Sequence, residues 1–272
     1  MEKSIMQRIY SIFKEFIYFI RWLCSYILSK KDHHKTPIFF DKDILVLGNG
    51  PSASELDFAG LIGRYDFCCV NFFCLRNNMF KQIKPKFYIL IDPIFFKGKK
   101  AQEELWNMLE SVDWPMYLIT YNDITLPVEN SNIIKMGINR NYYGGEFNGL
   151  KQLLFNRNIA TIGYQNVIIA AIYFFVMERV STKVYLAGVE NDWHKEFYVD
   201  ENNQVFSESV HFYGKEKMKW NCNKGEFYKC IYEYYMTAYQ YHIMSEYAKG
   251  NGVSVYNTTM HSFIDVFDKK KI

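Results

Sequence analysis

The sequence lacks the paired cysteines and the excess of charge that mark several common classes of protein. Its six cysteines include no Cys-x-x-Cys pair, and no histidines at metal-ligand spacing accompany them, so we expect free thiols and no zinc site. Lys and Arg total 32 against 29 Asp and Glu, and the net charge of +3 is too small to indicate nucleic acid as a partner. What is present is a chain of 272 residues, 49% hydrophobic, which is long enough to bury the core of an α/β domain.

The N-terminal region also lacks an uninterrupted apolar run. Residues 9–28 are mostly apolar, but Lys14, Glu15 and Arg21 interrupt a stretch that would need about 20 apolar residues to cross a membrane. No small-residue cleavage site follows, which argues against a signal peptide. The apolar residues recur at helical spacing, as Ile9, Ile12, Phe13, Phe16, Ile20, Leu23, Cys24 and Ile27. The pattern therefore predicts an amphipathic helix.

The composition of this helix and its flank indicates a membrane surface. Tyr18, Trp22 and Tyr26 suit a water–lipid boundary, and a basic cluster follows at residues 30–35. We therefore predict that residues 9–35 lie on a membrane surface as a peripheral anchor. The alternative is a helix packed on the protein's own core or on a partner subunit, and a homo-oligomer is left open. Residues 1–36 are assigned to the anchor and its linker, and residues 37–272 to one domain.

A glycine turn follows the first predicted strand of this domain. The short apolar segment 43–47 leads into Gly48-Asn49-Gly50-Pro51-Ser52, and a helix is expected to begin near Ala53. Glycines allow a ligand to approach the backbone closely, and the N–H groups of a helix start attract an anion. The third glycine of the dinucleotide fingerprint and the lysine of a P-loop are both missing. Taken alone, the motif therefore favours a phosphate site and a plain strand-to-helix turn about equally.

The rest of the chain alternates short apolar segments with helical or polar ones. Strands are predicted at 67–71, 87–92, 116–120, 132–136, 183–188 and 253–256, and helices at 164–176 and 226–249. This alternation predicts an α/β fold, a mostly parallel Rossmann-like sheet with helices on both faces. Asn71, Asp92 and Glu190 follow the ends of three of these strands, and ligands bind at that edge of such sheets. The polar, aromatic-rich segment 191–225 interrupts the rhythm, and we interpret it as an irregular lid or acceptor loop.

At this point the residues resemble a known family. The turn Gly48 to Ser52, the strand-end Asn71 and the segment 186–190 occur in the same order in bacterial sialyltransferases of the small, membrane-associated, metal-independent type, which the chain resembles over residues 43–214. It resembles more closely a group of transferases from surface-polysaccharide loci, some of them similar to galactofuranosyl-type transferases. That second resemblance rests on Asp92-Pro93, on the segment 193–214 and on the closing stretch 257–265.

The resemblance implies a site and a reaction. The residues that match Asn49, Gly50 and Asn71 contact the nucleotide in the sialyltransferases, a tyrosine placed like Tyr198 binds the donor phosphate, and a loop histidine is the catalytic base. Together with the strand-end positions and the loop residues, the resemblance gives two predicted sets. The donor-binding set is Gly48, Asn49, Gly50, Pro51, Ser52, Asn71, Asp92, Thr161, Gly188 and Glu190, and the catalytic set is His211, Tyr198, Tyr213 and His194. Glu190 and Asp92 replace the family's Asp and Asn, so the donor is left open between a CMP-sialic-acid-like sugar and a UDP-sugar of galactofuranose type.

An inverting transfer needs a base for the acceptor hydroxyl, and a neutral histidine with a pKa of about 6.5 suits this role. His211 is the first candidate and His194 the second, and the Gly50-to-Ser52 backbone is expected to help bind the phosphate. The only Asp-x-Asp spacing, Asp41-Lys42-Asp43, precedes its strand, so neither a metal nor another cofactor is expected. The predicted function is transfer of a sugar to a glycan or glycolipid acceptor of lipopolysaccharide, O-antigen or capsule. The alternatives are a pyrophosphokinase-like nucleotide-binding enzyme and a noncatalytic membrane-bound assembly protein.

Overall fold

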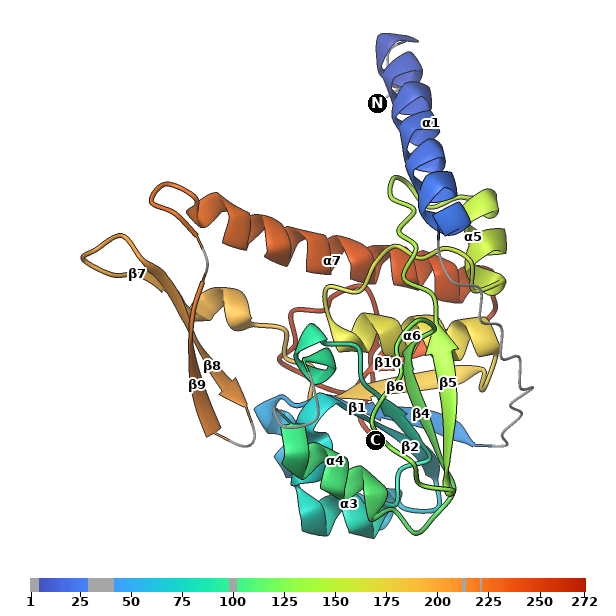
Figure 1. Ribbon diagram of the computed structural model, residues 1–272, viewed down its shortest axis with the longest axis vertical. Helices are drawn as coiled ribbons and strands as arrows, with labels where there is room; N and C mark the ends of the chain where they lie inside the picture. Colours follow the sequence, from blue (N-terminus) through green and yellow to red (C-terminus); the bar gives the residue numbers. More distant parts are fainter. Residues whose placement is uncertain (1–4, 29–41, 98–101, 212–213, 221) are drawn as a thin grey trace.

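Eight parallel strands form the central sheet of the protein (Figure 1). The structure, a computed structural model, describes residues 5–28, 42–97, 102–211, 214–220 and 222–272. The strands are β1 (Asp43–Leu47), β2 (Tyr65–Val70), β3 (Phe87–Ile89), β4 (Met116–Tyr121), β5 (Ile133–Ile138), β6 (Lys183–Ala187), β10 (Ser254–Asn257) and β11 (Asp268–Lys269). Their order across the sheet is β11-β10-β6-β1-β2-β3-β4-β5, and each of these neighbouring pairs is parallel.

This strand order contains one reversal. From β1 the chain builds outward through β2, β3, β4 and β5, and then returns to place β6 on the other side of β1. The carboxyl ends of β1 and β6 therefore flank the point at which the winding direction changes. In open α/β sheets a crevice forms there, because the connections leave the two strands on opposite faces.

The alternation of side chains along the strands explains why both faces of the sheet are covered. Ile44 and Val46 of β1 belong to one buried cluster, while Leu45 and Leu47 belong to the other. Helices α5 (Gly149–Asn156), α6 (Val167–Glu178) and α7 (Phe227–Gly250) contribute to the first cluster, and α2 (Phe58–Leu61), α3 (Asn77–Ile83) and α4 (Glu103–Glu110) to the second. Every residue from Ile168 to Met177 in α6 is buried, as expected for a helix that is apolar all round. The predicted α/β Rossmann-like class is confirmed.

Two local predictions were wrong. Instead of a helix from Ala53, a 3-10 helix (η1, Pro51–Glu55) follows β1 and ends at Leu56, whose extended backbone (φ −73°, ψ 134°) prevents further helical turns before α2. Segment 191–225 is not irregular either. It contains a 3-10 helix (η5, Trp193–Glu196) and an antiparallel sheet of β7 (Phe197–Val199), β8 (Val205–His211) and β9 (Gly214–Lys219). Asp200, whose side chain accepts from the Asn202 and Gln204 N–H groups, shapes the turn between β7 and β8.

The predicted N-terminal helix is present as α1 (Ile5–Leu28), and its C-terminal half packs on the body of the protein. Trp22 is only 5% exposed; its Nε1 donates to the Ile159 carbonyl at 3.1 Å, and its ring stacks on Tyr143 with centroids 5.6 Å apart. The expectation that Trp22 lies at a lipid boundary was therefore wrong, because the body of the protein covers it. The N-terminal half of α1 projects away from the body (Figure 1). None of the described helices is both long and apolar enough to cross a membrane. The predicted basic cluster at 30–35 lies outside the described residues.

Candidate functional site

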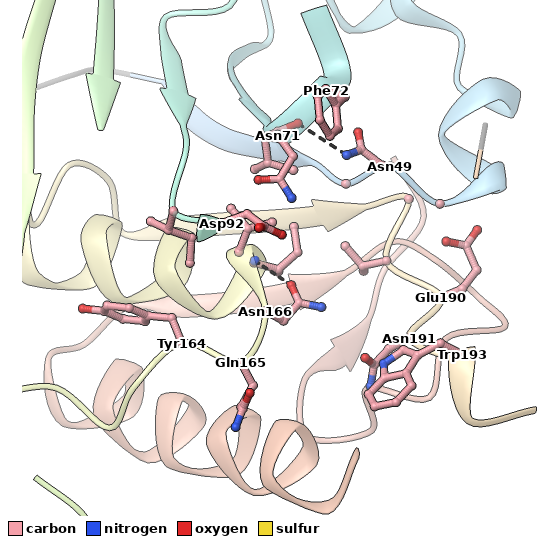
Figure 2. A pocket seen from close by; sticks show the side chains of 18 of the residues that line it. Asn49, Asn71, Phe72, Asp92, Tyr164, Gln165, Asn166, Glu190, Asn191 and Trp193 are labelled. Carbon is pink, nitrogen blue, oxygen red and sulfur yellow. Dashed lines mark hydrogen bonds between the residues drawn. The ribbon is translucent and has the colours of Figure 1, made fainter. Parts of the chain in front are cut away.

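A pocket of about 870 Å³ opens at the carboxyl edge of the sheet, at the point where the strand order reverses. Its walls come from the segments that follow β1, β2, β3, β4 and β6, from the start of α6 and from Tyr241 of α7. Figure 2 shows Asn49 and Asn71 along one side of it, with Asn166 across from them. Segments more than 100 residues apart in the chain thus meet in one cavity.

The structure brings most of the predicted donor-binding residues to this pocket. Those that line it are Gly48, Asn49, Gly50, Pro51, Asn71, Asp92, Gly188 and Glu190. Ser52 lies directly behind the wall, where its N–H donates to Glu190 Oε1 at 2.8 Å. Thr161 lies elsewhere: it is fully buried, and its Oγ1 accepts from the Gly163 N–H at 3.2 Å. Thr161 therefore shapes a loop and does not line the pocket.

The predicted catalytic residues all belong to the inserted segment. The His194 ring packs between Tyr234 and Phe263, at centroid distances of 4.3 and 4.7 Å, next to the pocket residue Trp193. Tyr198 lies on β7, where its ring stacks on Phe206 at 5.4 Å, away from the residues that line the pocket. His211 ends β8, but its side chain is not among the described ones, and Tyr213 lies outside the described residues.

The glycine turn after β1 does not present an open anion cradle, which is one of the two alternatives that the sequence left for this motif. The Gly48 and Gly50 N–H groups donate to the carbonyls of Ala187 and Gly188, at 2.8 and 2.9 Å, and the Ser52 N–H donates to the Glu190 carboxylate. A negative charge thus already occupies the start of η1, where a phosphate was expected. The expected contact between the Gly50-to-Ser52 backbone and the donor phosphate stays a prediction, and it would require Glu190 to leave the Ser52 N–H.

The glycines of this turn are instead explained by the close approach of the β1 and β6 ends. A Cβ atom at Gly48 would lie 2.3 Å from the Gly188 carbonyl oxygen, and one at Gly50 would lie 1.6 Å from Glu190 Oε2. Both contacts are shorter than van der Waals distance, so a side chain at Gly48 would push the two strand ends apart, and one at Gly50 would displace the Glu190 side chain. The glycines of this motif are therefore required by the packing of neighbouring strand ends, whether or not the turn also contacts a ligand.

Several buried polar atoms around the pocket lack a hydrogen-bond partner within the described part of the chain. They are Asn49 Oδ1, Asn71 Oδ1, Glu190 Oε2, Asn191 Oδ1 and the Tyr241 hydroxyl, all on residues that line the pocket. A buried polar group without a partner costs about 1–3 kcal/mol. Asn71 and Asn191 also have left-handed backbones, with φ of 50° and 53°, which strained functional sites often contain. Unsatisfied acceptors gathered in one cavity indicate a polar ligand rich in hydroxyl and N–H donors.

The start of α6 is the part of the site that the sequence prediction missed. Asn166 is the N-cap of α6: its side chain accepts from the Ile168 N–H at 2.8 Å, and Asn166, Val167 and Ile168 all line the pocket. The partial positive charge of a helix N-terminus thus faces the cavity. An Asn directly before a long apolar helical run is a recognisable capping signal, but the predicted helix begins three residues too early, at Tyr164.

Aromatic side chains and carboxylates complete the walls. Phe72, Tyr121, Tyr164 and Trp193 line the pocket, and burial raises the pKa of both tyrosines, which keeps them neutral. The Tyr164 hydroxyl donates to the Asn139 carbonyl at 3.0 Å. The lining carboxylates are Asp92, Glu190, Asp192 and Glu196, against Lys97 as the lining cation. Across the part of the chain that the structure describes, no three acidic, His or Cys side chains are placed to hold a metal ion.

Comparison with known proteins gives a distant likeness in structure and none in sequence. No protein-family model matches the chain, and no curated protein matches it. Two solved structures are similar: the sialyltransferase CstII from Campylobacter jejuni in complex with the substrate analogue CMP-3FNeuAc, and a tyrosine-to-phenylalanine variant of the sialyltransferase CST-II in complex with CMP. Each is 13% identical, with 84% of this chain and 85% of that chain covered and a TM-score of 0.37.

Proposed function

We propose that the protein is a glycosyltransferase that binds a nucleotide-activated sugar in this pocket and transfers the sugar to a cell-surface glycan or glycolipid. The observation that carries the proposal is the group of buried, unpartnered polar atoms at the strand-order reversal, where α/β folds bind nucleotides. A nucleotide sugar supplies what this cavity lacks, because its ribose, base and sugar carry many O–H and N–H donors. The sequence resemblance over residues 43–214 favours this class of ligand over other polar ones.

The donor orientation follows from the two ends of the pocket. Asn49 and Asn71 offer amide groups for the base or ribose on the β1–β2 side. We place the phosphate at the N-terminus of α6, because the Glu190 carboxylate already accepts from the Ser52 N–H at the start of η1. The sugar then extends toward Trp193 and η5. A CMP-sialic-acid-like donor and a UDP-sugar of galactofuranose type both satisfy this arrangement.

The proposed chemistry is an inverting transfer without a metal. A histidine takes the proton of the acceptor hydroxyl, the oxygen attacks the anomeric carbon, and the bond from that carbon to the phosphate oxygen breaks, so that the phosphate leaves with its electron pair. His211 is retained as the first candidate base and His194 as the second. His194 is supported by its place beside Trp193 and by its buried Nδ1, which has no partner among the described residues.

Donor binding is the first test. We expect one of CMP, UDP or GDP, or one of their sugars, to raise the melting temperature, because a ligand that binds only the folded state stabilises it by mass action. Asn71→Ala should weaken that nucleotide by about fivefold to tenfold, the effect of roughly 1 kcal/mol for one hydrogen bond. Asn78→Ala, at an exposed position of α3, is the matched control. Absence of stabilisation by every nucleotide would refute the proposal.

Turnover separates the proposal from its rivals. His211→Ala or His194→Ala should lower transfer by about 100-fold or more if that side chain is the base. Unchanged turnover in chelator is expected, and loss with rescue by manganese would refute the metal-independent mechanism. Consumption of ATP with magnesium would indicate a pyrophosphokinase-like enzyme instead, while an unimpaired glycan phenotype in both histidine variants would indicate a noncatalytic assembly protein.

Attachment to the cytoplasmic face of the inner membrane through residues 9–35 is part of the proposal. It is supported by the exposed apolar side chains on the projecting half of α1.

A further inference from the structure

We propose that the outer face of α7 and the projecting half of α1 together form one surface that docks on an anionic bilayer, and that this surface presents the pocket to a glycolipid acceptor. We call it the α1/α7 surface; it consists of Met6, Ile9, Tyr10, Ile12, Phe13 and Phe16 of α1 and of Phe227, Tyr228, Ile231, Tyr232 and Tyr235 of α7. The part that concerns the acceptor rests on the proposed function, whereas the docking itself does not.

Helix α7 has one buried and one exposed apolar face. Toward the sheet, Tyr241, Met244 and Tyr247 are buried in the core. On the opposite side of its first half, Tyr228, Tyr232 and Tyr235 are between 56% and 65% exposed. Large apolar side chains at this spacing form a continuous exposed row, and contiguous patches of this kind mark interaction sites.

The projecting half of α1 also exposes large apolar side chains that a partner could cover. Met6, Ile12 and Phe13 are between 60% and 77% exposed. An isolated helix of fewer than about 12 residues is marginally stable in water, and this one also exposes apolar surface. A partner that buries these side chains would stabilise the projecting turns.

A hydrogen-bonded loop holds the two parts together. Glu15 of α1 accepts from Lys151 Nζ at 3.0 Å and from the Glu146 N–H at 3.1 Å, and the Lys151 side chain is 1% exposed. Next to this loop residue, the Gly145 carbonyl accepts from the Tyr239 hydroxyl at 3.1 Å. The ring of Tyr239 continues the α7 row, because it stacks on Tyr235 at 6.1 Å. Helix α1 therefore leaves the body near Tyr239, the last tyrosine of the row. Figure 1 shows α1 rising beside the second half of α7.

Charge and side-chain chemistry favour an anionic bilayer as the partner. The first 36 residues contain seven Lys and Arg against three Asp and Glu, so their net charge, seven minus three or +4, exceeds the +3 of the whole chain. Basic residues next to an amphipathic helix are attracted to anionic headgroups. Tyrosine has an apolar ring and a polar tip, and it is enriched where membrane meets water. Two copies of the same basic helix would repel each other, so a second copy fits this surface less well.

The same helix connects this surface to the pocket. Tyr234, on the inner side of α7, packs against His194 at 4.3 Å and Trp193 at 5.1 Å. One helix diameter, about 10–12 Å, thus separates the tyrosine row from the candidate base. An acceptor whose sugar projects from a lipid headgroup by about that distance could reach the pocket while the protein stays bound. The acceptor class inferred is therefore a glycolipid in the same bilayer.

Vesicle co-sedimentation of the full chain tests the docking. We expect binding to phosphatidylcholine vesicles that contain phosphatidylglycerol and much weaker binding to phosphatidylcholine alone. The double variants Ile12→Ser with Phe13→Ser, and Tyr232→Ser with Tyr235→Ser, should each lower the partition coefficient at least tenfold. Ile134→Ser, at a 42% exposed position of β5, is the matched control and should bind as the wild type does.

Three further measurements make the outcome decisive. If the tyrosine variant binds vesicles as strongly as the wild type, the role of α7 is overturned. Sedimentation equilibrium without lipid tests for a second copy. A wild type that is dimeric and variants that are monomeric would identify a second copy as the true partner. Both variants should keep the donor-induced rise in melting temperature and transfer to a short soluble acceptor, while transfer to a vesicle-bound acceptor falls at least tenfold. If a nucleotide stabilises the protein but both double variants bind vesicles as the wild type does, this inference alone is refuted. If the wild type binds vesicles but no nucleotide stabilises it, the proposed function alone is refuted.

Discussion

Replacement of Gly50 by alanine is expected to destabilise the protein mainly through a new contact with Glu190. The Gly50 backbone is extended (φ −69°, ψ 157°), a conformation that alanine adopts freely, so the substitution creates no backbone strain. The added Cβ would instead lie 1.6 Å from Glu190 Oε2 and 2.8 Å from the Gly188 carbonyl oxygen. The Glu190 side chain must therefore move, and the Ser52 N–H loses its acceptor.

The loss of stability in Gly50→Ala can be worked out from the displaced Glu190 side chain and the lost Ser52 hydrogen bond. Overpacking of this kind costs about 1–3 kcal/mol in the free energy of unfolding. For a domain of about 150–250 residues, 1 kcal/mol shifts the melting temperature by about 2–4 °C, so Gly50→Ala should lower it by roughly 2–12 °C. Glu190→Ala alone should cost about 1 kcal/mol, because it removes the acceptor of the Ser52 N–H.

A double-mutant cycle isolates the contact. In the Glu190→Ala background the carboxylate is gone, and only the contact with the Gly188 carbonyl opposes the new Cβ. The cost of Gly50→Ala, measured by urea unfolding, should therefore fall by about 1 kcal/mol or more, within the range observed for touching residues. Equal costs in both backgrounds, to within about 0.3 kcal/mol, would refute the placement of Glu190 against the turn.

Three further predictions concern residues that support the site. Trp22→Ala should lower the free energy of unfolding by about 3–5 kcal/mol and expose α1 to limited proteolysis, because it removes a buried ring that docks the helix. Tyr88→Phe should cost about 1–3 kcal/mol, and it should weaken donor binding, because the Tyr88 hydroxyl accepts from the Cys74 N–H and donates to the Asn71 carbonyl at the pocket. Burial raises the pKa of Cys74 from 9.0 to about 12, so its contribution to stability is complete below pH 9 and is lost as the pH rises toward 12; urea titrations at pH 8, 9.5 and 11 should show the decline, and Cys74→Ala should reduce its slope.

The buried strands could be predicted from the sequence because their signal is local. Segment 43–47 is a continuous apolar run next to a glycine turn, and β1 has those bounds. The order of such segments along the chain was enough to predict a parallel sheet and the edge at which Asn71, Asp92 and Glu190 meet. Residues at strand ends meet because of the topology, whatever their separation in sequence.

What could not be predicted depends on contacts between distant segments. Nothing near Ser52 shows that its N–H will donate to Glu190, which lies 138 residues further along the chain. Likewise, Trp22 belongs to an amphipathic pattern that suits both lipid and protein, and only the carbonyl of Ile159, 137 residues away, decides between them. The hairpin in segment 191–225 could not be predicted because a turn residue such as Asp200 is equally typical of an irregular loop.

These long-range contacts change what the glycine turn says about the donor. If the turn bound a phosphate, the nucleotide would be anchored at β1 and the sugar would point across the sheet. The start of η1 is capped by the Glu190 carboxylate, whereas the N-terminus of α6 at the pocket is capped by the uncharged Asn166 side chain, so we place the anion at α6. An anion placed there leaves Asn49 and Asn71 for the nucleoside and directs the sugar toward Trp193. The anomeric carbon of the sugar would then lie on the side of the pocket next to α7, with the exposed tyrosines on the outer face of that helix. The proposed donor orientation and the proposed membrane surface therefore both predict that the acceptor enters from the side of α7.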